Sequence, residues 1–192
     1  MMEVIILKFI TVIDVPKIDE IIDTGCLSDN YVFDIEDGAK GIISGALKEL
    51  NLDSDSIVNG YCIDESYGDL SKLWFNYLKQ LPVKTGDVIV QFGVSGDECL
   101  FCDFNDFMEF NYCDDYERIG DIISYRFDKD KIAFTQQLDL ALFEKAFIVS
   151  DEWSKDDLVE SSLNSSSNVI TNINNLKAIG DSSVWRKWWK NI

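Results

Sequence analysis

Residues 87–104, with the sequence DVIVQFGVSGDECLFCDF, decide the fold class. Residues 88–92 are rich in β-branched side chains and predict a strand that ends at Ser95 and Gly96. Residues 98–104 alternate between two faces and predict a second strand. The segment before them carries helical patterns, so strands and helices come in separate runs along the chain.

Patterns on the N-terminal side of this region add further elements. Residues 4–13 are rich in β-branched side chains and predict a first strand, and Pro16 then opens a short helix. Residues 31–33 predict a second, short strand. In residues 70–81, leucine and aromatic side chains recur every three or four positions, which predicts an amphipathic helix that ends at Pro82.

A helix is also predicted over residues 39–50, where apolar side chains recur at helical spacing behind Asp37, a candidate N-cap. Gly41 and Gly45 interrupt this pattern, and each weakens a helix by about 1 kcal/mol relative to alanine. We therefore expect the two glycines to mark close packing against a neighbouring element.

Towards the C-terminus, residues 121–127 and 147–149 predict two more strands, and Ser154 begins a predicted helix over residues 155–163. Runs of helices thus separate runs of strands, which is typical of α+β proteins and not of a regular βαβ alternation. We expect a single α+β domain in which a mostly antiparallel sheet is flanked by amphipathic helices.

The C-terminal part of the chain divides by composition. Residues 1–163 form the predicted α+β body, and residues 164–175 are a Ser/Asn-rich loop. Residues 176–192 return to a helical pattern with three tryptophans and flanking cations. A basic amphipathic helix can lie on a membrane, but a net charge of −18 makes this the weaker alternative. We expect this Trp-rich helix to dock on the body.

The composition excludes several classes of function. The 192 residues include 35 acids, 17 bases and no histidine, which gives a formal charge of −18. Without histidine there is no Ser-His-Asp or Cys-His catalysis and no His-ligated zinc. A strongly negative chain is also repelled by nucleic acid and by anionic membranes. The options that remain are a protein that binds a basic partner and a protein that uses its carboxylates chemically.

The sequence predicts a cytoplasmic location. Residues 1–14 are apolar, but Glu3, Lys8 and the lack of a small-residue cleavage site do not fit a signal peptide. No stretch reaches the ~18 uncharged apolar residues that span a membrane. The five cysteines are an odd number at irregular spacings, which fits reduced thiols better than a disulfide framework.

Negative charge is concentrated in the middle of the chain. Residues 1–84 have a net charge of −8, residues 85–130 one of −9 and residues 131–192 one of −1. The acids between 97 and 121 interleave with Phe and Tyr, and Arg118 is the only base among them. This arrangement is either a solvated strand face whose aromatics point inward, or a surface whose crowded charges are compensated by a basic partner and whose aromatics anchor it. We favour the second interpretation, with candidate partner-binding residues Asp103, Asp106, Phe107, Glu109, Tyr112, Asp114, Asp115 and Glu117, of which Phe107 and Tyr112 are the anchors.

Metal and carboxylate chemistry find little support in the sequence. The acidic segment has no D-x-[DN]-x-[DN]-G loop of a calcium-binding hand, and nothing singles out a carboxylate pair for hydrolysis. Cys99 and Cys102 have the C-x-x-C spacing, but residues three apart on a strand face opposite sides and cannot chelate one ion. We expect buried thiols, no metal, no cofactor and no catalytic residue.

The later part of the chain resembles a known family. The resemblance is carried by residues 125–132, residues 138–143, the run FIVSDE at 147–152 and the short helix through Leu158 and Leu163. This series is similar to the closing segment of bacterial immunity proteins of polymorphic toxin systems, including the contact-dependent growth inhibition and type VI kinds. The resemblance implies neutralisation of a cognate toxin by binding, without chemistry of its own.

We therefore expect a cytoplasmic immunity protein that binds a cognate, basic toxin domain, such as a nuclease, through its acidic, aromatic-interleaved segment. Two rival hypotheses stay open. A DNA mimic of the antirestriction kind would copy phosphate spacing with its carboxylates, although the evenness of the remaining charge and the many aromatics argue against it. An enzyme that uses carboxylates with a divalent metal would be stabilised against heat by Mg²⁺, Mn²⁺ or Ca²⁺.

Overall fold

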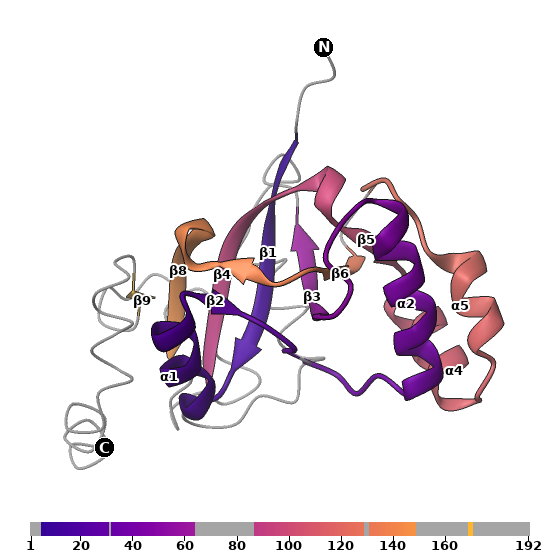
Figure 1. The fold of residues 1–192 in the computed structure, drawn as a ribbon, viewed down its shortest axis with the longest axis horizontal. Coiled ribbons are helices and arrows are strands. Elements are labelled where there is room, and N and C mark those ends of the chain that lie inside the picture. The colour runs from indigo at the N-terminus through magenta and orange to yellow at the C-terminus, as the bar shows by residue number, and fades with distance from the viewer. Residues whose placement is uncertain (1–4, 31, 64–86, 129–130, 149–168, 171–192) are drawn as a thin grey trace, which may run out of the picture.

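The described residues form a seven-stranded sheet in which every neighbouring pair of strands is antiparallel (Figure 1). The computed structural model describes residues 5–30, 32–63, 87–128, 131–148 and 169–170. The order of the strands across the sheet is β5-β6-β3-β1-β4-β8-β9. Their bounds are β1 (Ile6–Ile13), β3 (Val58–Ile63), β4 (Val88–Ser95), β5 (Leu100–Cys102), β6 (Lys131–Thr135), β8 (Phe143–Ile148) and β9 (Val169–Ile170).

Helices cover both faces of the sheet, which confirms the predicted α+β class in a single domain. One face packs against α1 (Val15–Thr24) and a ribbon of β2 (Cys26–Leu27) and β7 (Leu138–Asp139). The other face packs against three helices, seen on the right in Figure 1: α2 (Asp37–Glu49), α4 (Phe104–Tyr112) and α5 (Tyr116–Ile122). Short 3₁₀ turns, Gly96–Glu98 and Leu140–Leu142, follow β4 and β7.

The sheet side chains alternate between two cores. The α1-side core includes Leu7, Phe9, Val90, Phe92, Ile18 and Ile21, and the α2-side core includes Leu100, Phe134, Ile43, Leu47, Phe107 and Ile119. The strands predicted at residues 4–13 and 88–92 are confirmed as β1 and β4. They lie side by side in the middle of the sheet, paired from Ile6↔Ser95 to Ile13↔Val88. Most of their apolar side chains are buried, Ile6 being an exception, because elements packed on both faces of the sheet cover these central strands.

α1 begins and ends with the signals that its sequence carries. The Asp14 side chain accepts a hydrogen bond of 3.0 Å from the backbone N–H of Lys17, and Pro16 stands in the first turn. Gly25, with a φ of +76°, ends the helix and donates its N–H to the carbonyl of Ile21. The predicted opening of this helix at Pro16 is therefore confirmed.

α2 confirms the helix predicted over residues 39–50, with two corrections. Glu36, not Asp37, occupies the N-cap, and Asp37 is the first helical residue. A Cβ built on Gly41 or Gly45 would meet nothing within 4 Å, so these glycines do not mark close packing. The close approach is at Gly38 instead, where a Cβ would lie 2.2 Å from the ring of Tyr116.

The strand predicted at residues 31–33 is wrong for the two residues that the structure describes, Val32 and Phe33. Both are buried but lie outside any strand. The side chain of Asn59 makes the hydrogen bonds that a neighbouring strand would otherwise make. Its Oδ1 accepts from Val32 N at 2.5 Å, and its Nδ2 donates to Phe33 O at 3.1 Å. The backbone polar groups are thus satisfied without a ladder.

Two strand predictions in the acidic region also need correction. The strand predicted at 98–104 shortens to β5, because Asp103 caps α4 by accepting from the backbone N–H groups of Asn105 and Asp106. Within β5 the predicted alternation holds, with Phe101 in the α1-side core and Leu100 in the α2-side core. The strand predicted at 121–127 is wrong, since α5 continues to Ile122 and only a single bridge, Phe101↔Ser124, follows it.

Several predicted C-terminal and central elements lie outside the described residues. These are the helices at 70–81, 155–163 and 176–192. Most of the Ser/Asn-rich stretch 164–175 also lies outside them, and its residues Val169–Ile170 form β9, which pairs with β8. The late strand predicted at 147–149 is confirmed for residues 147–148, which end β8.

Candidate interaction surface

The acidic segment is built on helices, and helical spacing separates its acids from its aromatics. On α4, Phe107 and Phe110 are buried, whereas Asp106, Glu109 and Tyr112 are exposed at intervals of three residues. Tyr112 keeps 59% of its surface exposed. The sequence predicted strands at 98–104 and 121–127 but no helix between them, so the helical separation of these side chains was not foreseen.

Phe107 cannot serve as an anchor for a partner, which corrects the sequence interpretation. Its side chain has no exposed surface. Its ring lies 5.1 Å from the ring of Phe134 and 5.7 Å from that of Phe33, between centroids. Phe107 therefore belongs to the α2-side core, and its burial positions α4 against β6. Tyr112 is the predicted anchor that the structure leaves accessible.

Asn111 joins the acidic segment to a second group of acids at the start of α2. This side chain is fully buried; its Oδ1 accepts from Glu36 N at 3.0 Å and its Nδ2 donates to Asp34 O at 3.2 Å. These contacts hold the chain before α2 against the C-terminal half of α4. The exposed acids Asp34, Glu36 and Asp37 are thereby brought to the same surface, and sequence reasoning missed them.

Tyr116 makes a second connection between the same two regions. Its ring lies against Gly38 in the first turn of α2, and its hydroxyl donates a hydrogen bond to Asp114 Oδ1. This hydrogen bond, partial desolvation and the negative charges of Asp114, Glu36 and Asp37 raise the pKa of Tyr116 to about 12. The pKa of the Tyr116 phenol therefore depends on carboxylates from both segments.

We call this surface the acidic helical face and define it by ten residues: Asp34, Glu36, Asp37, Asp103, Asp106, Glu109, Asp114, Asp115, Glu117 and Asp121. The predicted acids divide between its two ends. Asp103 caps α4 and Asp106 lies in its first turn, and the others lie at its C-terminal end, in the turn to α5 and on α5. The nine residues of α4 span roughly 13 Å, so one partner surface of ordinary size can contact both ends.

Neighbouring bases neutralise little of this charge. The segments 34–40 and 103–121 contain ten acids and two bases, Lys40 and Arg118. Lys40 lies 3.3 Å from Asp37, and Arg118 lies 3.7 Å from Asp115 with its guanidinium 4.1 Å from the ring centroid of Phe110. Both ion pairs are solvent-exposed, so each contributes at most about 1 kcal/mol. These two described segments therefore carry a formal net charge of −8.

The C-x-x-C cysteines behave as the sequence predicted. Cys99 lies in the α1-side core and Cys102 in the α2-side core, so they point to opposite faces of the sheet and share no site. Burial raises the pKa of the Cys102 thiol and that of Cys62. In the described ranges, no group of three or more Cys, Asp or Glu side chains is arranged to hold a metal ion.

No protein-family model matches the chain, and neither curated proteins nor solved structures match it. No helix of the described residues has the length and apolar character needed to cross a membrane.

Proposed function

We propose that this protein is a cytoplasmic immunity protein that neutralises a cognate, basic toxin domain by binding it through the acidic helical face. The observation that carries the proposal is the convergence of two acidic segments, 75 residues apart in sequence, through the buried side chain of Asn111. Gathering like charges destabilises a fold, and a basic partner would relieve this repulsion. The resemblance of the later chain to immunity proteins points the same way.

The arrangement supports inhibition by complementarity and needs no chemistry from this chain. Exposed acids that face a cationic partner raise the rate of association with it and weaken the binding of proteins without complementary charge. Tyr112 stands among them as an exposed aromatic of the type that dominates binding energy at interfaces. Its neighbour Glu109 and the nearby Asp114 would form the polar rim of such an interface.

Growth protection tests this proposal in cells. The gene immediately upstream is the expected toxin gene, so its product would be expressed alone and together with this protein. We expect growth arrest by the toxin alone and normal growth with both. Unrelieved toxicity would contradict the proposal, and protection against several unrelated DNA-binding enzymes would favour a DNA mimic instead.

A further inference from the structure

A salt bridge crosses β4 on the face of the sheet opposite α1. Lys8 on β1 donates to Glu144 Oε1 on β8 at 2.5 Å, and Gln91 on β4 donates from its Nε2 to Glu144 Oε2 at 2.6 Å. Gly93 leaves room for the carboxylate, because a Cβ at this position would lie 2.8 Å from Glu144 Oε1. The two oxygens of the Glu144 side chain are thus held by the two central strands of the sheet.

The strand that carries Glu144 is irregular at the same place. β8 pairs with β4 in regular register up to Gln91↔Lys145, and the register then shifts by one residue so that Phe92 lies opposite Phe143. Glu144 is therefore the extra residue of a β-bulge, a feature that re-aims side chains within a sheet. The salt bridge and the change of register coincide at this one residue.

Without the bulge, β8 would direct a charged side chain into the α1-side core. One bulge-free register would place Glu144 opposite Phe92, and the other would place Lys145 opposite Val90. Directly opposite residues of antiparallel strands share a face, and both Phe92 and Val90 belong to the α1-side core. In the observed register Ala146 lies opposite Val90 instead and is fully buried. The register of β8 therefore decides which of its side chains enter the core.

The contacts of Glu144 do not maximise stability. The Gln91 side chain is buried, its bond to Glu144 fixes the orientation of the amide, and no described group donates to its Oε1. A buried acceptor without a donor lowers the free energy of unfolding, and an ion pair taken out of water adds little to it. The selection of one register among several is the best-attested use of such buried polar groups.

We propose that Glu144 is a positioning residue whose carboxylate, held by Lys8 and Gln91, locks the register of β8 on β4. Without this lock the bulge-free register becomes accessible. The consequence extends to β9, because β9 pairs with β8 and a shift of β8 would move the position at which β9 attaches. The inference goes beyond the proposed function and does not depend on the acidic helical face.

Cross-strand nuclear Overhauser effects in the full-length protein report the register. The wild type should show contacts between the rings of Phe92 and Phe143, whose centroids lie 6.4 Å apart. In Glu144→Leu the lock is lost and an apolar side chain can face the core, so we expect Phe92 to contact the new leucine and to lose its contact with Phe143. Glu144→Gln keeps an oxygen acceptor and should keep the wild-type contact. An unchanged Phe92–Phe143 contact in Glu144→Leu would overturn the proposal.

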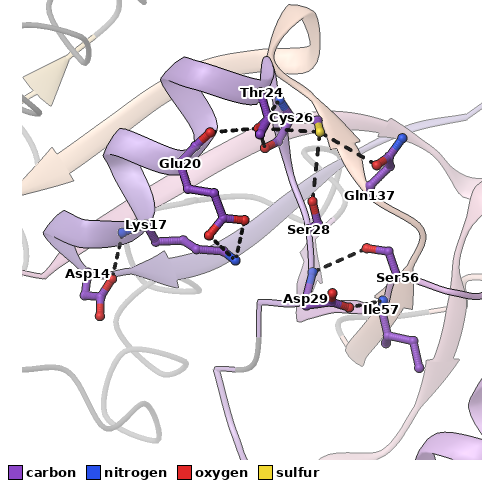
Figure 2. A network of polar contacts seen from close by, with 10 residues as sticks. All are labelled: Asp14, Lys17, Glu20, Thr24, Cys26, Ser28, Asp29, Ser56, Ile57 and Gln137. Carbon is purple, nitrogen blue, oxygen red and sulfur yellow. Dashed lines mark hydrogen bonds and ion pairs between the residues drawn. The ribbon is translucent and has the colours of Figure 1, made fainter.

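Hydrogen exchange of Lys8→Met decides the question where Glu144→Leu does not fold. This variant removes one donor to the carboxylate and keeps an aliphatic stem. The amides of residues 143–146 should exchange about tenfold faster than in the wild type, the usual effect of losing one charge-assisted bond. The control is Glu20→Leu, which removes a Lys–Glu pair of 2.9 Å with Lys17 on the exposed side of α1 (Figure 2). Unchanged exchange in Lys8→Met, or an equal acceleration in Glu20→Leu, would contradict the lock.

Discussion

Replacing Asn111 by leucine removes the contact that holds the two acidic segments together, and its cost follows from the structure. The variant loses two hydrogen bonds, of 3.0 Å to Glu36 N and 3.2 Å to Asp34 O. Each contributes a net stabilisation of about 1 kcal/mol, and leucine fills a similar volume. We therefore expect the free energy of unfolding to fall by about 2 kcal/mol, a large part of the roughly 5–15 kcal/mol that stabilises a typical domain. For a chain of this size, Tm should fall by about 4–8 °C.

Urea denaturation followed by circular dichroism measures this loss directly. Asn105→Leu is the matched control, because Asn105 lies on the same helix but is exposed, and its variant should stay within about 0.5 kcal/mol of the wild type. Since Asn111 acts through Glu36 and Asp34, the amide resonances of residues 34–38 should also shift in Asn111→Leu. A loss of less than 0.5 kcal/mol, or an equal loss in Asn105→Leu, would refute the role given to Asn111.

Three other predictions follow from single contacts. Gly38→Ala should lower the free energy of unfolding by about 1–3 kcal/mol, because the new Cβ would overlap the Tyr116 ring. Gly41→Ala should raise it by about 0.5–1 kcal/mol, because a Cβ at Gly41 would meet no other atom. Thermal unfolding of both variants distinguishes the two outcomes. The pKa of Tyr116, which is raised to about 12, should fall towards its ordinary value of 10 in Asp114→Ala. The difference in phenolate absorbance between wild type and Tyr116→Phe reports this ionisation, and an unchanged titration in Asp114→Ala would contradict the prediction. The stability that the neutral phenol contributes is complete below pH 10 and is lost as the pH rises towards 12. A thiol reagent should label exposed Cys113 rapidly in the native protein and leave three buried thiols unlabelled until unfolding, and mass spectrometry would identify them as Cys62, Cys99 and Cys102.

Local patterns were enough to predict the central strands and the first helices, because their signals are complete within a few residues. β1 and β4 are rich in β-branched side chains, with the run Val88–Val90 at the start of β4, and Asp14 with Pro16 marks the start of α1. β3 carried no such signal, since Asn59 and Gly60 interrupt it. The structure explains both exceptions: Asn59 bonds the buried segment at Val32, and Gly60 leaves room for the ring of Phe9.

The acidic helical face could be predicted only in part. The concentration of acids was visible in the sequence. A helix signal was also present, because Phe104, Phe107 and Phe110 recur every three residues behind Asp103 as a cap, but the prediction of a strand at 98–104 overlooked it. The contribution of residues 34–37 was not visible, because it depends on contacts of Asn111 and Tyr116 across more than 70 residues of sequence. No local pattern encodes such a juxtaposition.

The most direct test of the central claim is the affinity of the purified toxin domain for two charge-reversed variants with the same net charge. The first, Asp106→Lys/Glu109→Lys/Glu117→Lys, alters the acidic helical face, and the second, Asp19→Lys/Asp23→Lys/Asp55→Lys, alters exposed acids elsewhere. Isothermal titration calorimetry at 50 and 150 mM salt should give about 100-fold weaker binding for the first variant and less than about threefold for the second, with wild-type binding weakening as salt rises. Equal losses in both variants, or none in the first, would contradict the account.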